Sequence, residues 1–241
     1  MFIQLRYLSN AMRFGVPSLR RATFRMPRSV RIGGRSLQLS YPSEQGISAD
    51  FVTCCMVDEY GLSRISGPVH TILDLGSNVG FFSLAARARF PAAAIHAYEP
   101  NPRVLRHLRP NAEACGVKVF AEAVGDRAGC VTMTERGDSN QARTRAVESG
   151  DIPLVALSTA VARLGGRVDL AKIDCEGAEW EMFQDVQAWT GIRQLRMEYH
   201  LWQRHEYREL SSKLTELGFR IERHSPSGEW GTIWAARRSQ T

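Results

Sequence analysis

The sequence predicts an α/β fold with a mostly parallel seven-stranded sheet, an antiparallel last strand, and an N-terminal extension made of a hairpin and a helix. Apolar, strand-like runs alternate with amphipathic, helix-like segments from Val69 onward, and this alternation requires crossover connections between parallel strands. The last two strand-like runs are joined by the turn sequence SPSGEWG, which indicates a hairpin and therefore an antiparallel last strand. With 241 residues, 44% of them hydrophobic and 23% charged, the chain can bury a core of enzyme size.

The chain divides into a basic N-terminal arm at 1–27, a hairpin and helix at 28–68, and the α/β domain at 69–241. The alternating stretch SVRIGGRSLQLSY, centred on Gly33 and Gly34, is typical of a two-stranded hairpin. The amphipathic pattern over 44–62 predicts a helix that ends at Gly61 and packs on the core.

The strands predicted for the α/β domain are 69–75, 92–99, 117–124, 168–174, 194–199, 219–224 and 232–237. The helices predicted between them are 79–90, 102–116, 177–189 and 205–218. Pro91 ends the first of these helices, and Pro102 occupies a first-turn position, where proline is tolerated.

The pattern is less regular in the middle of the chain. The stretch CVTMTER, at 130–136, predicts a strand, whereas the polar stretch 136–151 predicts a loop. Residues 152–157 then lead to Ser158, the expected N-cap of the next helix.

The net charge of +6 is unevenly distributed. Residues 1–43 contain eight Arg and no Asp, Glu or Lys, so residues 44–241 carry a net charge of −2. The arm therefore admits three interpretations: a basic amphipathic helix on an anionic membrane surface, a mitochondrial presequence, or an extension packed on the domain.

Cysteine usage and hydropathy indicate a cytoplasmic protein, with peripheral contact at the inner membrane face if the arm binds lipid. The five Cys are odd in number and include no C-x-x-C spacing, which predicts reduced thiols and neither a disulfide framework nor a zinc site. No run of 18 or more apolar residues occurs, so we expect no membrane span.

The stretch TILDLGSNVGFFSL places Asp74 at the end of a strand and Gly76 and Gly80 in the turn that follows. Ligands bind at this edge of open α/β sheets. Asn78 stands where a dinucleotide site of the G-x-G-x-x-G type has its middle glycine, and a carboxylate before the turn would repel a pyrophosphate. Glu99, at the end of the next strand, suits the two hydroxyls of a ribose. A cationic ligand that carries a ribose points to S-adenosylmethionine (SAM).

Acids and a histidine end two further strands on the same side. Asp174 ends one central strand, and Glu198 and His200 end the next. We expect Asp174 or His200 to act as a general base, with Glu176 and Glu198 orienting the acceptor or the base. Glu179 has capping-box spacing from Glu176 and is expected to be structural. We expect no metal here; the alternative is a divalent ion held by Asp174, Glu198 and His200.

The sequence resembles the FkbM family of SAM-dependent methyltransferases in the stretches ILDLGSNVGFFSL, AYEPNP, AVGD and DLAKIDCEGAEWEMF followed by MEYH. The resemblance spans roughly Val69 to Ala236 and implies a Rossmann-like class I methyltransferase fold, SAM as the cofactor, and usually O-methylation. The cofactor-site residues that it implies are Asp74, Gly76, Ser77, Asn78, Gly80, Glu99, Asn101, Ala123, Val124 and Asp174. The stretch 130–150 and the Arg-rich arm are not distinctive of the family, and we expect both to shape the acceptor site.

The expected function is SAM-dependent O-methyl transfer to a hydroxyl of a sugar, glycan or natural-product acceptor. One alternative is an NAD(P)-dependent oxidoreductase, against which the missing G-x-G-x-x-G argues. The other is an RNA-binding or RNA-modifying protein that uses the basic arm. The near-neutral remainder of the chain, which has no interleaved basic and aromatic stripe, argues against a nucleic-acid partner.

Overall fold

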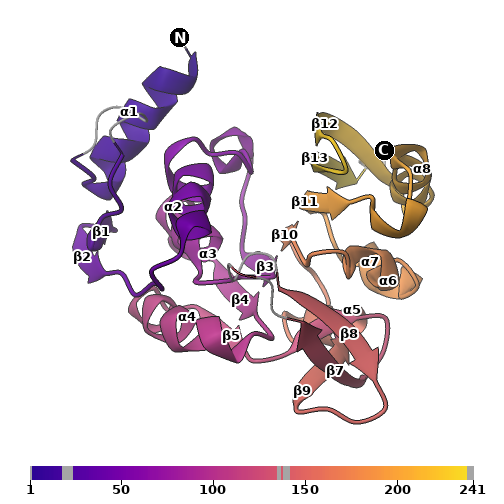
Figure 1. Cartoon of the computed structure of the whole chain (residues 1–241). Coiled ribbons are helices and arrows are strands. Elements are labelled where there is room, and N and C mark those ends of the chain that lie inside the picture. The colour runs from indigo at the N-terminus through magenta and orange to yellow at the C-terminus, as the bar shows by residue number, and fades with distance from the viewer. Residues whose placement is uncertain (1, 18–23, 135–136, 138–141, 238–241) are drawn as a thin grey trace.

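A computed structural model describes residues 2–17, 24–134, 137 and 142–237, and its centre is a seven-stranded sheet (Figure 1). In spatial order the strands are β12 (Phe219–Ser227), β13 (Trp230–Arg237), β11 (Gln194–His200), β10 (Leu170–Ile173), β3 (Thr71–Leu75), β4 (Ala94–Tyr98) and β5 (Lys118–Phe120). All neighbouring pairs from β11 to β5 are parallel, whereas β13 runs antiparallel to β11 and β12. The predicted α/β class, strand number and antiparallel last strand are confirmed.

Helices cover both faces of this sheet because the strands are apolar on both sides. Ile72 packs in one core cluster, together with α1, α3 and α4, while its neighbour Leu73 packs in the other, with α5 to α8. The helices are α3 (Phe81–Arg89), α4 (Pro102–Ala114), α5 (Leu157–Ala162), α6 (Glu179–Met182), α7 (Val186–Thr190) and α8 (Tyr207–Glu216). This two-layer cover leaves the carboxyl ends of the parallel strands as the place for a ligand.

A second, four-stranded sheet was not predicted. It consists, in spatial order, of β6 (Ala123–Gly125), β9 (Ile152–Ala156), β7 (Gly129–Thr134) and β8 (Arg143–Val147), and Figure 1 shows it at the lower right. The single strand predicted over 117–124 is therefore wrong, because its first half pairs with β4 and its second half with β9. The loop predicted over 136–151 is also wrong in its described second half, where pairing with β7 holds a polar strand in place. Its residues 138–141 lie outside the described residues.

Two helix predictions need correction. The helix predicted over 177–189 is divided into α6 and α7 at Asp185, whose φ of −85° and ψ of 62° are not helical. Ser158 is not the N-cap of α5, because the helix begins at Leu157 and its N-cap is Ala156. The backbone N–H of Ser158 instead donates to the Asp185 carboxylate at 2.7 Å, so a distant side chain satisfies this helix end.

The N-terminal region is packed on the α/β domain. It contains α1 (Phe2–Phe14), the hairpin of β1 (Ser29–Ile32) and β2 (Arg35–Gln38), and α2 (Gln45–Phe51), which continues as a π-helical turn (Val52–Met56). Tyr7, Ala11 and Phe14 of α1 are buried in the same core cluster as α3. The packed-extension interpretation of the arm is confirmed for α1, and the hairpin prediction is confirmed at Gly33 and Gly34.

Two outward-facing residues of α1, Leu5 and Met12, are exposed by 57% and 71%. Contact of α1 with a membrane surface therefore stays a prediction that co-sedimentation with anionic vesicles would check. In the described part of the chain, no helix has the length and apolar character needed to cross a bilayer.

Candidate functional site

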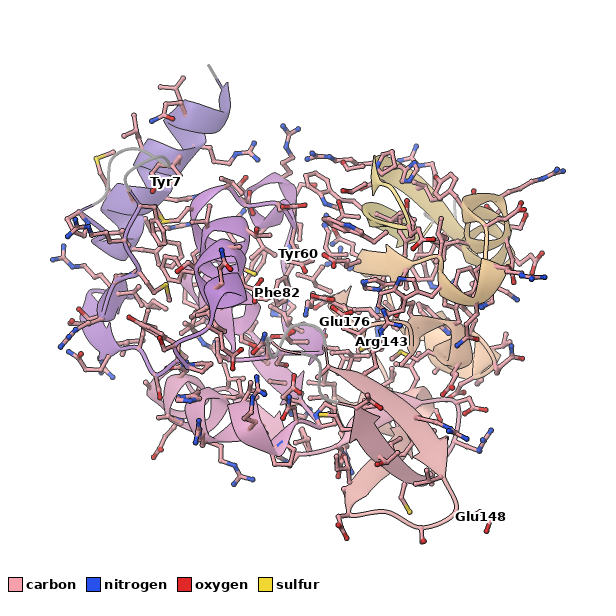
Figure 2. The ribbon with its side chains drawn as sticks, in the orientation of Figure 1. Tyr7, Tyr60, Phe82, Arg143, Glu148 and Glu176 are labelled. Atoms are coloured by element: carbon pink, nitrogen blue, oxygen red, sulfur yellow. The ribbon has the colours of Figure 1, made fainter. Side chains whose placement is uncertain are left out.

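A cavity of about 610 Å³ opens at the carboxyl ends of β3, β4, β10 and β11. Figure 2 shows Tyr60, Phe82, Arg143 and Glu176 around the space between the two halves of the molecule, and all four line this cavity. The residues come from segments far apart in the chain. Parallel strands gather them because their carboxyl ends meet at one edge of the sheet.

The glycine turn after β3 forms one wall of the cavity. Gly76 has a φ of 71°, and a Cβ atom there would lie 1.8 Å from the backbone oxygen of Asp174. Only glycine therefore lets β3 and β10 approach each other at this edge. The backbone N–H groups of Gly76 and Ser77 both donate to the Tyr98 carbonyl, at 3.1 and 3.0 Å, which fixes the turn to β4.

Glu99 occupies the position expected for a ribose-binding acid. It lines the cavity at the end of β4, and its two carboxylate oxygens accept the backbone N–H groups of Asn78 at 2.8 Å and Asn101 at 2.9 Å. Burial raises the pKa of Glu99 to about 7, against the opposing effect of these two hydrogen bonds. The carboxylate is therefore fixed in place with unused lone pairs for hydroxyl donors.

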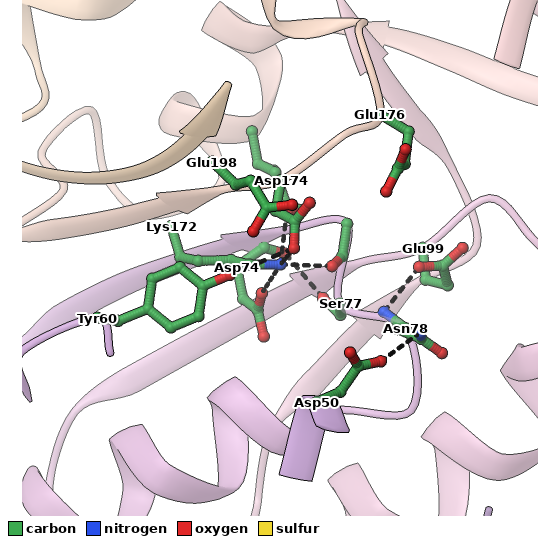
Figure 3. Close-up of polar contacts among 12 residues, drawn as sticks. Asp50, Tyr60, Asp74, Ser77, Asn78, Glu99, Lys172, Asp174, Glu176 and Glu198 are labelled. Carbon is green, nitrogen blue, oxygen red and sulfur yellow. Dashed lines mark hydrogen bonds and ion pairs between the residues drawn. The ribbon is translucent and has the colours of Figure 1, made fainter. Parts of the chain in front are cut away.

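Asp74 is not the exposed cation receptor that the sequence suggested. It is fully buried, its Oδ2 accepts the Ser83 hydroxyl at 2.6 Å, and its Oδ1 lies 3.6 Å from Nζ of Lys172 (Figure 3). The charge of Asp74 is thus balanced inside the protein, and it does not line the cavity. Lys172 also contacts Asp174 at 3.4 Å and the backbone oxygens of Leu75 and Gly76, so it ties β10 to the glycine turn.

The predicted cofactor residues fall into two groups. Those that line the cavity are Gly76, Ser77, Asn78, Glu99, Ala123, Val124 and Asp174. Asp74, Gly80 and Asn101 do not line it. Gly80 precedes α3 with a φ of 91° and lies against Leu108, while Asn101 caps α4 by accepting the Arg103 N–H at 2.9 Å. These three residues support the segments that form the cavity wall without contacting the cavity themselves.

The far end of the cavity brings together the predicted acceptor-site residues Asp174, Glu176, Glu198 and His200. His200 ends β11 and is 4% exposed. Its Nδ1 lies 3.1 Å from Oε1 of Glu179, which also accepts the backbone N–H of His200 at 2.8 Å. Glu179 is fully buried and accepts the Gly177 N–H as well. Its role is structural, as expected, but the expected capping box with Glu176 is wrong, because Glu179 is itself the first residue of α6 and Ala178 is the N-cap.

Burial, with the charge of neighbouring acids, raises several pKa values at this end. Burial, followed by the charge of Asp174, raises the pKa of Glu176 to about 7 and that of Glu198 to about 10. Burial lowers the pKa of His200, but its hydrogen bond to Glu179 and the surrounding carboxylates outweigh this and raise it. Burial also raises the pKa of the Cys175 thiol, with Glu179 and Asp174 adding to the effect, which makes Cys175 a poor nucleophile.

The residues that could hold a cation differ from those expected. Glu176, Glu198 and His200 have ligand atoms within 4.8 Å of one another. Asp174, expected in place of Glu176, instead interacts with Lys172 and with the Tyr60 hydroxyl at 3.3 Å (Figure 3). The alternative set of Asp174, Glu198 and His200 is therefore replaced by one that contains Glu176.

Several cavity residues had no individual prediction. Tyr60, Trp202 and Trp230 give the acceptor end aromatic surface, and Met133, Arg143 and Thr144 reach it from the second sheet. The guanidinium of Arg143 lies 3.2 Å from the centre of the Trp202 ring. The position of Arg143 bears out the expectation that the stretch 130–150 lies at this site. Lys172 could have been singled out from the sequence, because a lysine inside an apolar strand needs a buried partner.

Known methyltransferases are similar to this chain in sequence. "Methyltransferase sdnD" of Sordaria araneosa is 27% identical over 236 residues, and the match covers 80% of this chain and 90% of the relative. The "31-O-demethyl-FK506 methyltransferase FkbM" of Streptomyces tacrolimicus is 28% identical over 172 residues, which cover 55% of this chain and 66% of the relative.

Solved structures with a similar course of the chain include the SAM complex of Aeropyrum pernix fibrillarin, with a TM-score of 0.47, 14% identity, and coverage of 70% of this chain and 67% of that one. Another is the precorrin-6y C5,15-methyltransferase of Geobacter metallireducens, with a TM-score of 0.46, 14% identity, and coverage of 76% and 88%. The sheet order and the antiparallel β13 agree with the Rossmann-like class I methyltransferase fold that the sequence implied. The sequence profile of the "Methyltransferase FkbM domain" matches residues 74–221, more than half of the chain, and the chain therefore belongs to the FkbM methyltransferase family.

Proposed function

We propose that the protein transfers a methyl group from SAM to a hydroxyl of a sugar, glycan or natural-product acceptor. The observation that carries this proposal is one continuous cavity. Its first end holds the glycine turn and Glu99, and its second end holds Asp174, Glu176, Glu198 and His200. A donor bound at the first end would face an acceptor bound at the second.

The first end suits the parts of SAM. The Glu99 carboxylate, held by two backbone N–H groups, can accept hydrogen bonds from both ribose hydroxyls. Asp174, Glu176 and Glu198 line the space beyond the glycine turn, and an ionised carboxylate there favours a sulfonium ion. When bound, SAM supplies a methyl group that is already activated for transfer.

The second end suits an alcohol. Methyl transfer is an in-line displacement, so the acceptor oxygen must lie about 3 Å from the methyl carbon, opposite the sulfur. An alcohol is a weak nucleophile at neutral pH, and a carboxylate that takes its proton accelerates transfer by about 10²–10⁴. Asp174 is placed for that task, because it follows β10 directly and lines the cavity beside the glycine turn.

The surface of the acceptor end supports an organic polyol or polyketide-like acceptor. Tyr60, Trp202 and Trp230 offer flat apolar faces beside the carboxylates, a combination that holds the apolar face of a ring while hydroxyls are hydrogen-bonded. One relative is named for a 31-O-demethyl compound, and the proposal extends this class of chemistry to the present chain. Family membership removes the oxidoreductase alternative.

The proposal is tested by incubating the purified full chain with methyl-labelled SAM and a set of glycosides and polyketide alcohols, each paired with its amine analogue. We expect labelled methyl ethers and release of S-adenosylhomocysteine (SAH). Asp174→Asn should lower turnover by about 10² or more, with SAH affinity within a few-fold of wild type. Glu148→Gln is the matched control, because Glu148 is exposed and does not line the cavity (Figure 2). Transfer to amines alone, or failure of the wild type to bind SAH, would contradict the proposal.

A further inference from the structure

We infer that Glu176, Glu198 and His200 form a binding site for a divalent cation, with Mn²⁺ the best match to their donor atoms. The proposed role of the cation is to hold the acceptor hydroxyl beside the methyl donor. That role rests on the proposed function, whereas the binding site itself does not.

The distances among the donor atoms fit a single ion. Nε2 of His200 lies 3.7 Å from Oε2 of Glu176 and 3.7 Å from Oε1 of Glu198. Ligands at about 2.1 Å from an octahedral ion are about 3.0 Å apart when adjacent and about 4.2 Å apart when opposite. These two separations fall between the limits, and all three ligand atoms lie within 4.8 Å of one another, so side-chain adjustments would close the three donors around one ion.

The tautomer of His200 favours a metal ligand. Its Nδ1 lies 3.1 Å from the buried Glu179 carboxylate, and a proton on Nδ1 leaves the lone pair on Nε2, the atom that faces the two other carboxylates. The 3.7 Å distances are too long for hydrogen bonds, so among the described residues Nε2 is hydrogen-bonded to neither Glu176 nor Glu198, although His200 is only 4% exposed. A carboxylate that orients a histidine through its second nitrogen is the usual support of a metal-bound imidazole.

The local charge balance leaves room for a dication. In the described part of the chain, neither Glu176 nor Glu198 forms an ion pair with a lysine or an arginine. The buried ammonium group of Lys172 forms ion pairs with Asp74 and Asp174 instead. Once binding of the ion has displaced the protons from these ligands, two carboxylates and a neutral imidazole match the charge of one divalent ion. Their mixed oxygen and nitrogen donors suit Mn²⁺ better than Ca²⁺, which prefers oxygen ligands alone.

Backbone geometry presents Glu176 to this site. Glu176 has a φ of 51°, in the left-handed region that few residues other than glycine adopt, and Gly177 follows with a φ of 99°. Such conformations are energetically unfavourable and cluster at functional sites. Trp202 lies against Gly177, 3.0 Å from the position of an added Cβ, which keeps the turn tight.

With a cation at this position, the cation would bind the acceptor oxygen and Asp174 would accept its proton. The acceptor oxygen binds the cation, which lowers the pKa of its hydroxyl. The hydroxyl proton passes to the carboxylate of Asp174. An oxygen lone pair then forms the O–C bond to the methyl group, while the S–C bond breaks and its electron pair stays on sulfur to give SAH. The proton leaves Asp174 for solvent, so one acceptor and one SAM give one methyl ether, one SAH and one proton.

The test measures metal binding directly. Full-length protein is treated with EDTA, exchanged into metal-free buffer, and titrated with MnCl₂ while free Mn²⁺ is followed by electron paramagnetic resonance. We expect one strong site in the wild type. Glu176→Gln, Glu198→Gln and His200→Gln should each weaken it by at least about 100-fold, and Glu179→Gln by about 10–100-fold, the range seen when such supports are removed. Glu148→Gln should bind Mn²⁺ within a few-fold of wild type.

Circular dichroism and SAH titration on every variant separate loss of a ligand from loss of the fold. Absence of a strong site for Mn²⁺, Mg²⁺ and Zn²⁺ in the wild type would overturn the inference, as would unchanged binding in all three ligand variants. EDTA-resistant methyl transfer would overturn the cation's role and leave the proposed function standing. A strong Mn²⁺ site in a protein that transfers no methyl group to alcohols would support the site and refute the proposed function.

Discussion

Lys172 shows how a single residue can hold the cavity in shape. Its side chain is 4% exposed, and it contacts Asp74, Asp174 and two backbone oxygens at the ends of β3 and β10. Burying one cation between two acids costs desolvation energy, and removing one partner of such a cluster typically costs more than the cluster contributes. Lys172 therefore fixes the relative position of the glycine turn and Asp174, the two walls between which the donor methyl group would lie.

Glu99 gives a prediction for pH dependence at the residue scale. Its folded-state pKa of about 7 is raised above the ordinary value of 4.5, chiefly by burial. This raised pKa adds stability below pH 4.5, and that contribution is lost as the pH rises through 7. The ribose hydroxyls are bound best by the ionised carboxylate. SAH affinity should therefore rise about tenfold from pH 6 to pH 8, as measured by isothermal titration calorimetry.

Glu99→Gln is the matching variant, because glutamine keeps the shape of the side chain and cannot ionise. It should bind SAH more weakly at pH 8 and show a flat affinity from pH 6 to pH 8. Urea unfolding of the ligand-free protein between pH 4.5 and pH 7 should also show less loss of stability in this variant. A wild-type affinity that is independent of pH would contradict the assigned role of Glu99.

The element scale is best illustrated by α1. Tyr7 is 1% exposed inside the core cluster that contains α3, and its hydroxyl has no hydrogen-bond partner among the described residues. Asn10 adds a hydrogen bond to the Met56 carbonyl at 3.0 Å. Removal of α1 is therefore expected to disturb the cofactor cleft, because α1 shares a core with the helix that follows the glycine turn.

Substitutions at Tyr7 measure this packing. Tyr7→Ala should lower the free energy of unfolding by about 3–5 kcal/mol, the range for removing a large buried ring. Tyr7→Phe should leave it unchanged or raise it by about 1 kcal/mol, because phenylalanine keeps the ring and removes an unpaired hydroxyl. Both values come from urea unfolding at constant protein concentration. Equal stability of Tyr7→Ala and wild type would show that α1 is an appendage.

Elements with their own apolar pattern could be predicted from the sequence, and elements held by distant partners could not. The strand at β10 is predictable, because Leu170, Ala171 and Ile173 make it apolar apart from Lys172. The strand at β8 has the polar sequence RTRAV and exists because its backbone pairs with β7. The same contrast holds for the site. Strand-end rules located Asp174 and His200, whereas Tyr60 reaches Asp174 across 114 positions of sequence.

At the scale of the whole molecule, charge is separated between the surface and the cavity. The chain has a net charge of +6. The described residues that line the cavity nevertheless include seven acids, Asp50, Glu59, Glu99, Glu122, Asp174, Glu176 and Glu198, against two permanently basic residues, Arg143 and Lys172, and one histidine, His200. When the seven acids are ionised, they outnumber the positive charges of Arg143, Lys172 and a bound cationic donor. Anionic acceptors, RNA among them, are therefore disfavoured relative to neutral ones.

The excess of acidic residues around the cavity predicts discrimination against phosphorylated acceptors. For any alcohol that the protein methylates, kcat/KM should fall at least tenfold when a phosphate monoester is added at a neighbouring position, measured at about 0.01 M salt. The difference in kcat/KM between the alcohol and its phosphorylated form should become smaller at about 0.15 M salt, because the Debye length shortens from about 30 to about 8 Å. Glu122→Gln should reduce the discrimination, since Glu122 pairs with Arg163 and its loss leaves an uncompensated positive charge near the cavity. A phosphorylated acceptor that reacts as fast as its parent at low salt would show that the acceptor approaches by a route these acids do not control.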